Sequence, residues 1–191
     1  MTARITLIAH ASTEAQRHVA FPLDESIGEG ELEKVAALGW RAPRAQRVLS
    51  APELRTQQTA QALGLSASNS VDLCDCDYGV WRGRRMDEVQ SSDPEGILAW
   101  LTDPASSPHG GESVASLIAR TGRWVEGHSD VAHTVAVTHP AVIRSAIVYA
   151  LRMPAQTFWR FDVAPLSLTD LRFNGRVWTL RCAGCSLQIQ D

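Results

Sequence analysis

The sequence predicts an α/β fold in which helices cover both faces of a mostly parallel central sheet. Short apolar stretches rich in β-branched residues alternate with longer stretches that have the apolar spacing of helices, a pattern typical of strand-helix-strand units. Near the end of the chain, two strand-like stretches flank Asn174-Gly175, a strong signal for an antiparallel hairpin. Together these observations predict a three-layer α/β/α sandwich whose mostly parallel sheet has antiparallel edge strands.

Composition is consistent with one domain over residues 1–191. Of these residues 45% are hydrophobic and 20% are charged, which is ordinary for a globular protein large enough to bury a full core. The formal net charge of -3 gives no electrostatic reason to expect nucleic acid or an anionic membrane surface as a partner. Without a recognisable signal peptide or a run of about 18 apolar residues, a cytoplasmic protein is expected.

The first half of the chain begins with an apolar strand that stops at a histidine. Ile5, Leu7 and Ile8 form this strand, and a polar, irregular stretch is expected after it over residues 11–28. Pro52 suits the first turn of a later helix, because that position needs no backbone N–H. The predicted elements are strand 4–9, a helix over about 29–38, strand 47–50, a helix from Pro52 to about 63, and strand 71–74.

The second half contains an irregular stretch followed by regular elements. Residues 77–107 are expected to be irregular, with a sharp turn over 78–83 and helical pieces near 86–89 and 95–101. Residues 104–111 are expected to form a loop at the rim. An amphipathic helix is predicted over 112–126. The remaining predictions are strand 134–138, a helix from Pro140 to 151, and hairpin strands 167–173 and 176–182.

Four cysteines form two close pairs, which raises the question of a metal site. The spacing of Cys182 and Cys185 fits a zinc site, whereas Cys74 and Cys76 are too close for the usual zinc knuckle. No cluster of histidines and carboxylates with metal spacing accompanies His10 either. We therefore expect reduced cysteines packed as small apolar residues, with neither a metal nor another cofactor.

Two predicted strands end in a histidine, His10 and His139. Since the carboxyl ends of neighbouring parallel strands meet at one edge of a sheet, the two imidazoles can lie together there, one as nucleophile and one as donor. Arg55 opens a predicted helix, where a guanidinium beside the positive helix end can bind phosphate through two hydrogen bonds. Taken singly, each of these residues has an ordinary structural alternative: a locally satisfied histidine or a solvated arginine.

Taken together, these segments resemble the histidine phosphatase superfamily, the phosphoglycerate-mutase-like proteins. The resemblance runs in order from residue 4 to about 182 and ends with a hairpin that carries Trp178 after its turn. Ala9-His10-Ala11 stands where the family has Arg-His-Gly, and Ser50, Arg55, Thr59 and Ala60 match its Ser-x-x-x-x-Arg-x-x-x-Thr-Ala. Leu73, Asp75 and Gly79 resemble its Leu-x-Glu-x-x-x-Gly, which Trp81-Arg82-Gly83 follows. The later motifs are Gly111-Glu112-Ser113 with Arg120, and Val137-Thr138-His139 with Val142-Ile143-Arg144.

The resemblance implies phosphoryl transfer without a metal. His10 would attack phosphorus to give a phosphohistidine that water hydrolyses, while Arg55 and His139 hold the phosphoryl oxygens. Asp75 occupies the position of the family's acidic proton donor, with Asp77 as the alternative. Thr13, Arg17 and Arg82 are expected to contribute to substrate binding.

Departures from the family pattern predict weakened phosphate binding. Ala9 replaces an arginine that lies against the phosphate in the family, Ala11 replaces the glycine after the nucleophile, and Pro140 has no backbone N–H to donate. Ala9→Arg would then strengthen phosphate or vanadate binding. Arginines at the rim could compensate for the lost guanidinium; the candidates are Arg17, Arg82, Arg84 and Arg85.

The function expected first is hydrolysis of a small phosphorylated metabolite, with activity impaired by the weakened phosphate binding. Two alternatives stay open: an enzyme of the ribazole-phosphate phosphatase or mutase type, and a catalytically degenerate member that binds a ligand or partner. Substrate choice would lie in the region between residues 77 and 111. A homodimer is the default expectation if the chain assembles.

Overall fold

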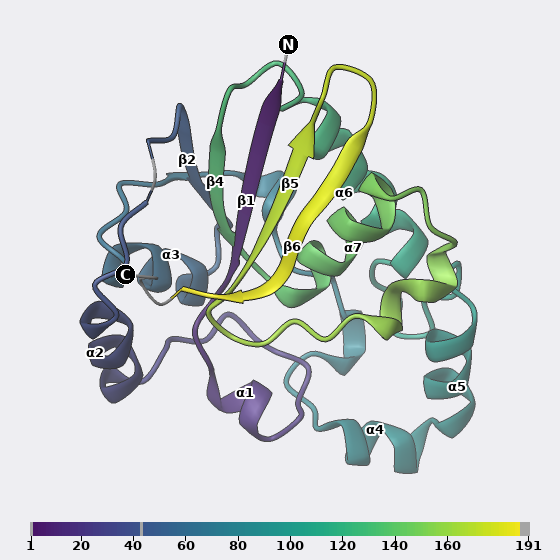
Figure 1. Cartoon of the computed structure of the whole chain (residues 1–191). Coiled ribbons are helices and arrows are strands. Elements are labelled where there is room, and N and C mark those ends of the chain that lie inside the picture. The colour runs from purple at the N-terminus through teal and green to yellow at the C-terminus, as the bar shows by residue number, and fades with distance from the viewer. Residues whose placement is uncertain (1, 43, 188–191) are drawn as a thin grey trace.

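The computed structural model describes residues 2–42 and 44–187 and has a six-stranded sheet as its centre. The strand order is β3-β2-β4-β1-β5-β6 (Figure 1). The strands are β1 (Ala3–Ala9), β2 (Arg47–Ser50), β3 (Ser68–Asn69), β4 (Thr134–Thr138), β5 (Ser167–Phe173) and β6 (Trp178–Ser186). The strands predicted at 4–9, 47–50, 134–138 and 167–173 are thus confirmed to within one residue.

Strand directions match the predicted mostly parallel sheet. β1 pairs in parallel with β4, and β2 pairs in parallel with both β4 and β3. β5 runs antiparallel to β1 and to β6, which forms the edge of the sheet. Because β1 and β4 are parallel neighbours with Ala9 opposite Thr138, the residues that follow them, His10 and His139, leave the sheet side by side.

Helices cover both faces of the sheet, as expected for three layers. Successive residues of β1 point to opposite faces: Leu7 packs in the core formed with α6 and α7, and Ile8 in the core formed with α2 and α3 (Figure 1). Those helices are α2 (Glu29–Ala37), α3 (Leu54–Ala62), α6 (Val114–Glu126) and α7 (Pro140–Ala150). None of the helices within residues 2–42 and 44–187 is long and apolar enough to cross a membrane.

Further helices and turns lie beyond the carboxyl ends of the parallel strands, with α1 and α4 at the bottom of Figure 1. There Phe21, Trp81, Val89, Ile97 and Trp100 form a small separate core. The elements are α1 (Glu14–Arg17), α4 (Met86–Ser92), α5 (Pro94–Thr102) and the 3₁₀ turns Val71–Leu73, Gly79–Trp81 and Ala155–Arg160.

The strand predicted at residues 71–74 is wrong, because the chain has already left the sheet there. β3 precedes it and has only two residues, and residues 71–73 form a 3₁₀ turn that buries Leu73. The carbonyl oxygens of Asp72 and Cys74 accept hydrogen bonds from Arg120 of α6 instead of from a strand. Within the stretch expected to be irregular, α1 forms because Thr13 and Gln16 cap it reciprocally.

The expectation of reduced cysteines is wrong for one pair, since Cys182 and Cys185 form a disulfide. Gly184, with a φ of +70°, bends β6 between them, and their Cα atoms lie 6.4 Å apart. Cys74 and Cys76 are free, and Cys76 is buried in the main core. β6 also extends to Ser186, beyond the predicted end of this strand.

At Gly111 the backbone passes close to the backbone of Asp77, and this contact fixes the loop over residues 74–78, which we call the Asp75 loop. A Cβ at Gly111 would lie 2.0 Å from the carbonyl oxygen of Asp77. We expect Gly111→Ala to lower the free energy of unfolding by about 1 to 3 kcal/mol, as overpacking does. Gly30→Ala is the matched control: nothing lies within 4 Å of a Cβ at Gly30 in α2, and alanine favours the helix. Equal midpoints for both variants in urea would contradict this account of the loop.

Candidate active site

His10 is held in the state that a nucleophile needs. Its backbone N–H donates to the carbonyl of Thr138 at 3.0 Å, which ties it to the end of β4. Its Nδ1 lies 2.8 Å from the carbonyl oxygen of Ala11, and because a carbonyl only accepts, Nδ1 carries the proton. The lone pair is therefore on Nε2. Burial, followed by the neighbouring charges of His139 and Arg55, lowers the pKa of His10 from 6.5 to about 3.

This lowered pKa predicts that His10 remains neutral well into the acid range. In ¹⁵N-labelled protein, the His10 signals, assigned by their loss in His10→Gln, should keep neutral-imidazole shifts from pH 8 to about pH 4. The unfolded chain binds a proton at this position below pH 6.5 and the native protein does not. This histidine therefore lowers the free energy of unfolding as the pH falls from 6.5 toward 3, by at most about 1.4 kcal/mol per pH unit. A titration midpoint near pH 6.5 for the His10 signals would contradict a buried, neutral imidazole at this position.

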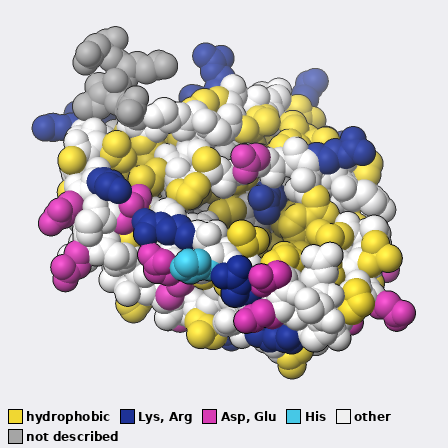
Figure 2. Space-filling model, turned by 90° about the horizontal axis from the view of Figure 1, so that it is seen from below, with side chains coloured by type: hydrophobic (Ala, Val, Ile, Leu, Met, Phe, Trp, Pro, Cys, Tyr) yellow, Lys and Arg dark blue, Asp and Glu magenta, His cyan; other side chains and the backbone are white. Residues whose placement is uncertain are grey.

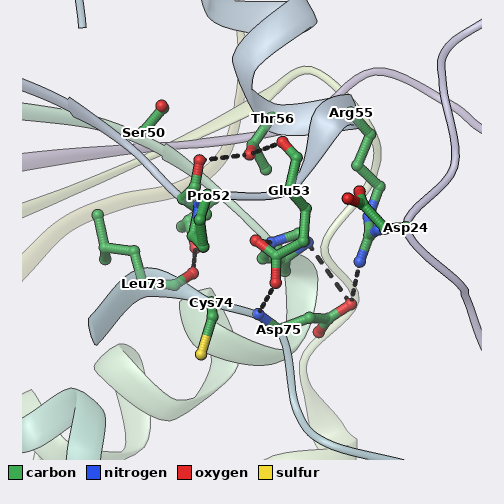
Figure 3. A network of polar contacts seen from close by, with 12 residues as sticks. Asp24, Ser50, Pro52, Glu53, Arg55, Thr56, Leu73, Cys74 and Asp75 are labelled. Atoms are coloured by element: carbon green, nitrogen blue, oxygen red, sulfur yellow. Dashed lines mark hydrogen bonds and ion pairs between the residues drawn. The ribbon is translucent and has the colours of Figure 1, made fainter. Parts of the chain in front are cut away.

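Arg55, the second residue of α3, brings a buried guanidinium to the same edge. Its Nη1 donates to the carbonyl of Leu23 at 2.9 Å, and its Nη2 donates to Oδ2 of Asp75 at 2.8 Å (Figure 3). Its Nε is buried and has no hydrogen-bond partner among the described residues. The guanidinium is thus fixed in direction, and the N–H groups that these two contacts leave unused can donate to a ligand oxygen.

Asp75 sits between the cationic groups of the site. Its Oδ2 contacts Arg55 and lies 3.5 Å from Nδ1 of His139. Burial alone would raise the pKa of Asp75, but the charges of His139 and Arg55 outweigh it and hold the pKa below its usual range. Asp77, the alternative acid, is exposed, its Oδ1 accepts from the backbone of Gly79, and it does not line the cavity that contains His10.

His139 is fully buried beside His10, with the ring centroids 5.2 Å apart. Its Nε2 donates to Oε2 of Glu53 at 2.9 Å, because a carboxylate oxygen only accepts. Glu53 also accepts from the backbone N–H of Asp75 at 2.9 Å through Oε1 (Figure 3). Burial raises the pKa of Glu53, yet the hydrogen bond and charge of His139 lower it more, to about 2.

Glu53 was not among the residues predicted for the site. It immediately precedes α3 and lies two positions before Arg55, inside the Ser50 to Ala60 motif. A carboxylate so close to a candidate phosphate-binding arginine was the available signal, although the sequence does not reveal that it would meet His139.

Arg120 of α6 fixes the Asp75 loop from the opposite side. Its guanidinium donates to the carbonyl oxygens of Asp72, Cys74 and Asp75 at 2.7 to 3.3 Å and pairs with Glu112 at 2.8 Å. The Gly-Glu-Ser segment and its arginine, noted in the sequence as a motif, therefore position Asp75 and do not themselves line the cavity that contains His10.

A cavity of about 230 Å³ joins most of the predicted residues. Its lining includes His10, Thr13, Arg55 and Asp75, with His139 packed behind His10. Arg17 instead lines a neighbouring cavity, and its guanidinium is paired with Glu14 and Glu31. Arg82 lines a third cavity of about 200 Å³ together with Glu53, Arg55 and Asp75.

Arg144 of α7, also absent from the predicted site, supplies a second guanidinium to the His10 cavity. Its Nε donates to the carbonyl of Phe161 at 2.8 Å, and its guanidinium lies 5.8 Å and 5.9 Å from the ring centres of Phe158 and Trp159. Burial lowers the pKa of Arg144. The sequence signal was its spacing from Pro140: one helical turn places both residues on the same face of α7.

The remaining arginines that could replace the one missing at position 9 lie elsewhere. Arg84 donates to Ser92, and Arg85 pairs with Asp87 at an exposed position. Ala9 itself is fully buried in the apolar core. Within the described residues there is also no group of three or more histidine, cysteine, aspartate or glutamate side chains that could hold a metal ion.

An open α/β sheet with a neutral histidine, one buried guanidinium and one half-buried guanidinium at the carboxyl ends of its strands defines a class of protein built to handle an anion such as a phosphoryl group. The chain matches the family model of the histidine phosphatase superfamily (branch 1) over residues 5–186. It therefore belongs to that family, as the motifs predicted.

Individual relatives agree with this assignment. A bifunctional protein of Mycobacterium tuberculosis is 30% identical over 187 residues, covering 90% of this chain and 51% of that protein. An adenosylcobalamin/alpha-ribazole phosphatase of Salmonella typhimurium is 29% identical over 174 residues, covering 84% of this chain and 85% of that enzyme. The chain thus spans about half the length of the mycobacterial relative and most of the length of the Salmonella one.

Solved structures share the fold. The alpha-ribazole phosphatase from Shigella flexneri superposes with a TM-score of 0.83 at 22% identity, covering 98% of both chains. At this low sequence identity, the similarity establishes the fold alone.

Proposed function

We propose that the protein is a metal-independent phosphomonoesterase that hydrolyses a small phosphorylated metabolite through a phosphohistidine at His10. The observation that carries this proposal is the tautomer of His10: Nδ1 is occupied by the carbonyl of Ala11, and Nε2 is an unprotonated nitrogen at a cavity that also contains Arg55. The phosphatase names of relatives that match most of the chain support the same reaction class.

In the first step, Nε2 of His10 attacks phosphorus and the bond to the leaving oxygen breaks. Arg55 and Arg144 bind the phosphoryl oxygens, and His139, held by Glu53, stabilises the charge that spreads over them. Asp75 is ionised in the free protein. A dianionic phosphoryl group drawing Arg55 away would raise the pKa of Asp75, so that it can bind a proton and pass it to the leaving oxygen.

In the second step, a water molecule attacks the phosphohistidine and His10 leaves as a neutral imidazole. Asp75, now a carboxylate, accepts the proton of that water. Phosphate leaves the cavity and the resting state returns, so no metal or external cofactor enters either step.

The affinity of this protein for phosphate should be lower than that of family members that keep the arginine at position 9. Ala9 contributes no guanidinium, Pro140 contributes no N–H, and Arg55 is shared with Asp75 before the substrate arrives. The same features favour a second candidate, a degenerate member that binds a ligand without turnover. The relatives also keep an enzyme of the ribazole-phosphate phosphatase type open as the finer identity.

Chelation tests the proposed function directly. After dialysis against a chelator, the protein should hydrolyse a panel of small phosphate monoesters at an undiminished rate, and vanadate should inhibit it, because the cavity supplies all the positive charge. Activity that disappears on chelation and returns with zinc or magnesium would contradict the proposal. Absence of turnover together with vanadate binding would favour the degenerate binding protein.

A further inference from the structure

A second, larger cavity adjoins the catalytic one and takes no part in the mechanism above. It has a volume of about 550 Å³, within the range of small-molecule sites. Gln16, Tyr78 and Arg144 belong to the walls of both cavities. A group attached to the phosphoryl oxygen in the smaller cavity therefore reaches the larger one along these shared walls.

Aromatic side chains dominate the far walls of this cavity. The rings of Trp100 and Trp159 meet edge to face at 4.4 Å, and Phe21 lies 5.6 Å from Trp100 and 5.2 Å from Tyr78. Trp100 is buried, so the wall is held in place by the small core around it. Such rings give a flat apolar group extensive contact with little loss of side-chain freedom.

The charged groups that line this cavity are guanidiniums, which can stack on the face of an aromatic ring as Arg144 does with Phe158 and Trp159. Arg17 and Arg144 line it, and no carboxylate side chain does so within the described residues. The indole Nε1 of Trp100 is buried and lacks a hydrogen-bond partner in that same part of the chain. Figure 2, which looks onto this edge of the sheet, shows basic side chains beside a hollow bordered by hydrophobic ones.

We propose that this cavity binds the leaving group of the substrate, and that the substrate is a phosphate monoester of a flat, apolar, aromatic alcohol larger than a single ring. This inference rests on the proposed function, because it assumes that the phosphoryl group lies at His10. Arg144 connects the two sites: it lines the smaller cavity, which contains His10, and its guanidinium lies against the ring of Trp159 in the larger cavity.

The test compares 2-naphthyl phosphate with phenyl phosphate, whose leaving groups are phenols of similar acidity. For the wild-type protein, kcat/KM should be roughly tenfold or more higher for the naphthyl ester, because its second ring buries additional apolar surface. The ratio of the two values cancels any general effect on phosphoryl transfer. A ratio near one would overturn the inference and leave the proposed function intact.

Two variants change the cavity in opposite ways. Trp159→Ala removes a wall and should bring the ratio toward one, whereas Met86→Trp fills the cavity and should bring it below one. Trp40→Ala is the matched control, since Trp40 is a half-buried tryptophan in the core on the other face of the sheet, and its ratio should equal that of the wild type. A ratio unchanged in both cavity variants, with folding verified by circular dichroism, would also overturn the inference.

Failure of the proposed function gives a different result. If neither ester is hydrolysed, the phosphoesterase proposal fails, and binding of naphthyl and phenyl phosphonates is measured by calorimetry instead. Tighter binding of the naphthyl compound, lost in Met86→Trp, would show that the cavity takes the flat group even without turnover. Equal binding of the two would overturn the cavity assignment.

Discussion

Alanine in place of His10 is expected to lower kcat for phosphomonoester hydrolysis by a factor on the order of 10⁴ or more, the scale of loss when a nucleophile is removed. The reason is the free lone pair on Nε2, which no other side chain at the His10 cavity provides within the described residues. His139 cannot substitute, because its Nε2 is bound to Glu53 and the ring is fully buried. Steady-state kinetics with an aryl phosphate measures the loss.

His133→Ala is the matched control for this variant. His133 is also a buried histidine, and its Nε2 lies 3.0 Å from Oγ1 of Thr6. It immediately precedes β4 and therefore lies at the amino ends of the parallel strands, whereas His10 lies at their carboxyl ends. Its replacement removes a comparable side chain and should leave kcat close to that of the wild type. Similar losses in the two variants would mean that the effect of His10→Ala is structural.

The second large effect is expected for Arg55→Ala, which should impair both stability and oxyanion binding. Without the guanidinium, Asp75 is left as a mostly buried carboxylate without its closest cation, and breaking such a pair costs roughly 3–5 kcal/mol in the free energy of unfolding. Loss of an arginine at a transferring phosphoryl group should lower kcat/KM by about 10³-fold. Vanadate binding should weaken with it.

Arg55→Lys and Arg4→Ala separate these effects. Lysine restores the charge without the planar pair of donors, so it should recover stability better than vanadate binding. Arg4→Ala breaks an ion pair with Asp170 at the far end of β1, where Arg172 still holds that carboxylate, and should leave catalysis unchanged. Full vanadate affinity in Arg55→Ala, measured below its unfolding transition, would contradict a phosphate-binding role.

The central strands were predictable because their apolar patterns are strong and local. β1, β2 and β4 are short apolar runs, and the turn at Asn174-Gly175 defined the hairpin. β3 was not predictable, since Ser68 and Asn69 carry no apolar signal and pair with only two residues of β2. The apolar residue that suggested a strand after it, Val71, is 74% exposed.

The site divides in the same way. His10, His139 and Arg55 could be predicted because each follows directly from the end of a strand or the start of a helix. Glu53 and Arg144 have weaker signals in their spacing from Arg55 and Pro140, and the contacts that bring them to the site are made with His139 and Phe161, which are distant in the sequence. The disulfide depends similarly on the bend of β6, which cysteine spacing does not reveal.

Trapping of the covalent intermediate tests the central claim most directly. Wild-type protein mixed with a phosphate monoester and quenched in alkali, where phosphohistidine survives, should yield one phosphoryl group on the peptide that contains His10, at Nε2. The label should appear before phosphate is released and should be absent from His10→Ala. Release of phosphate in a single turnover without any phosphohistidine, or with the label on another residue, would contradict the account.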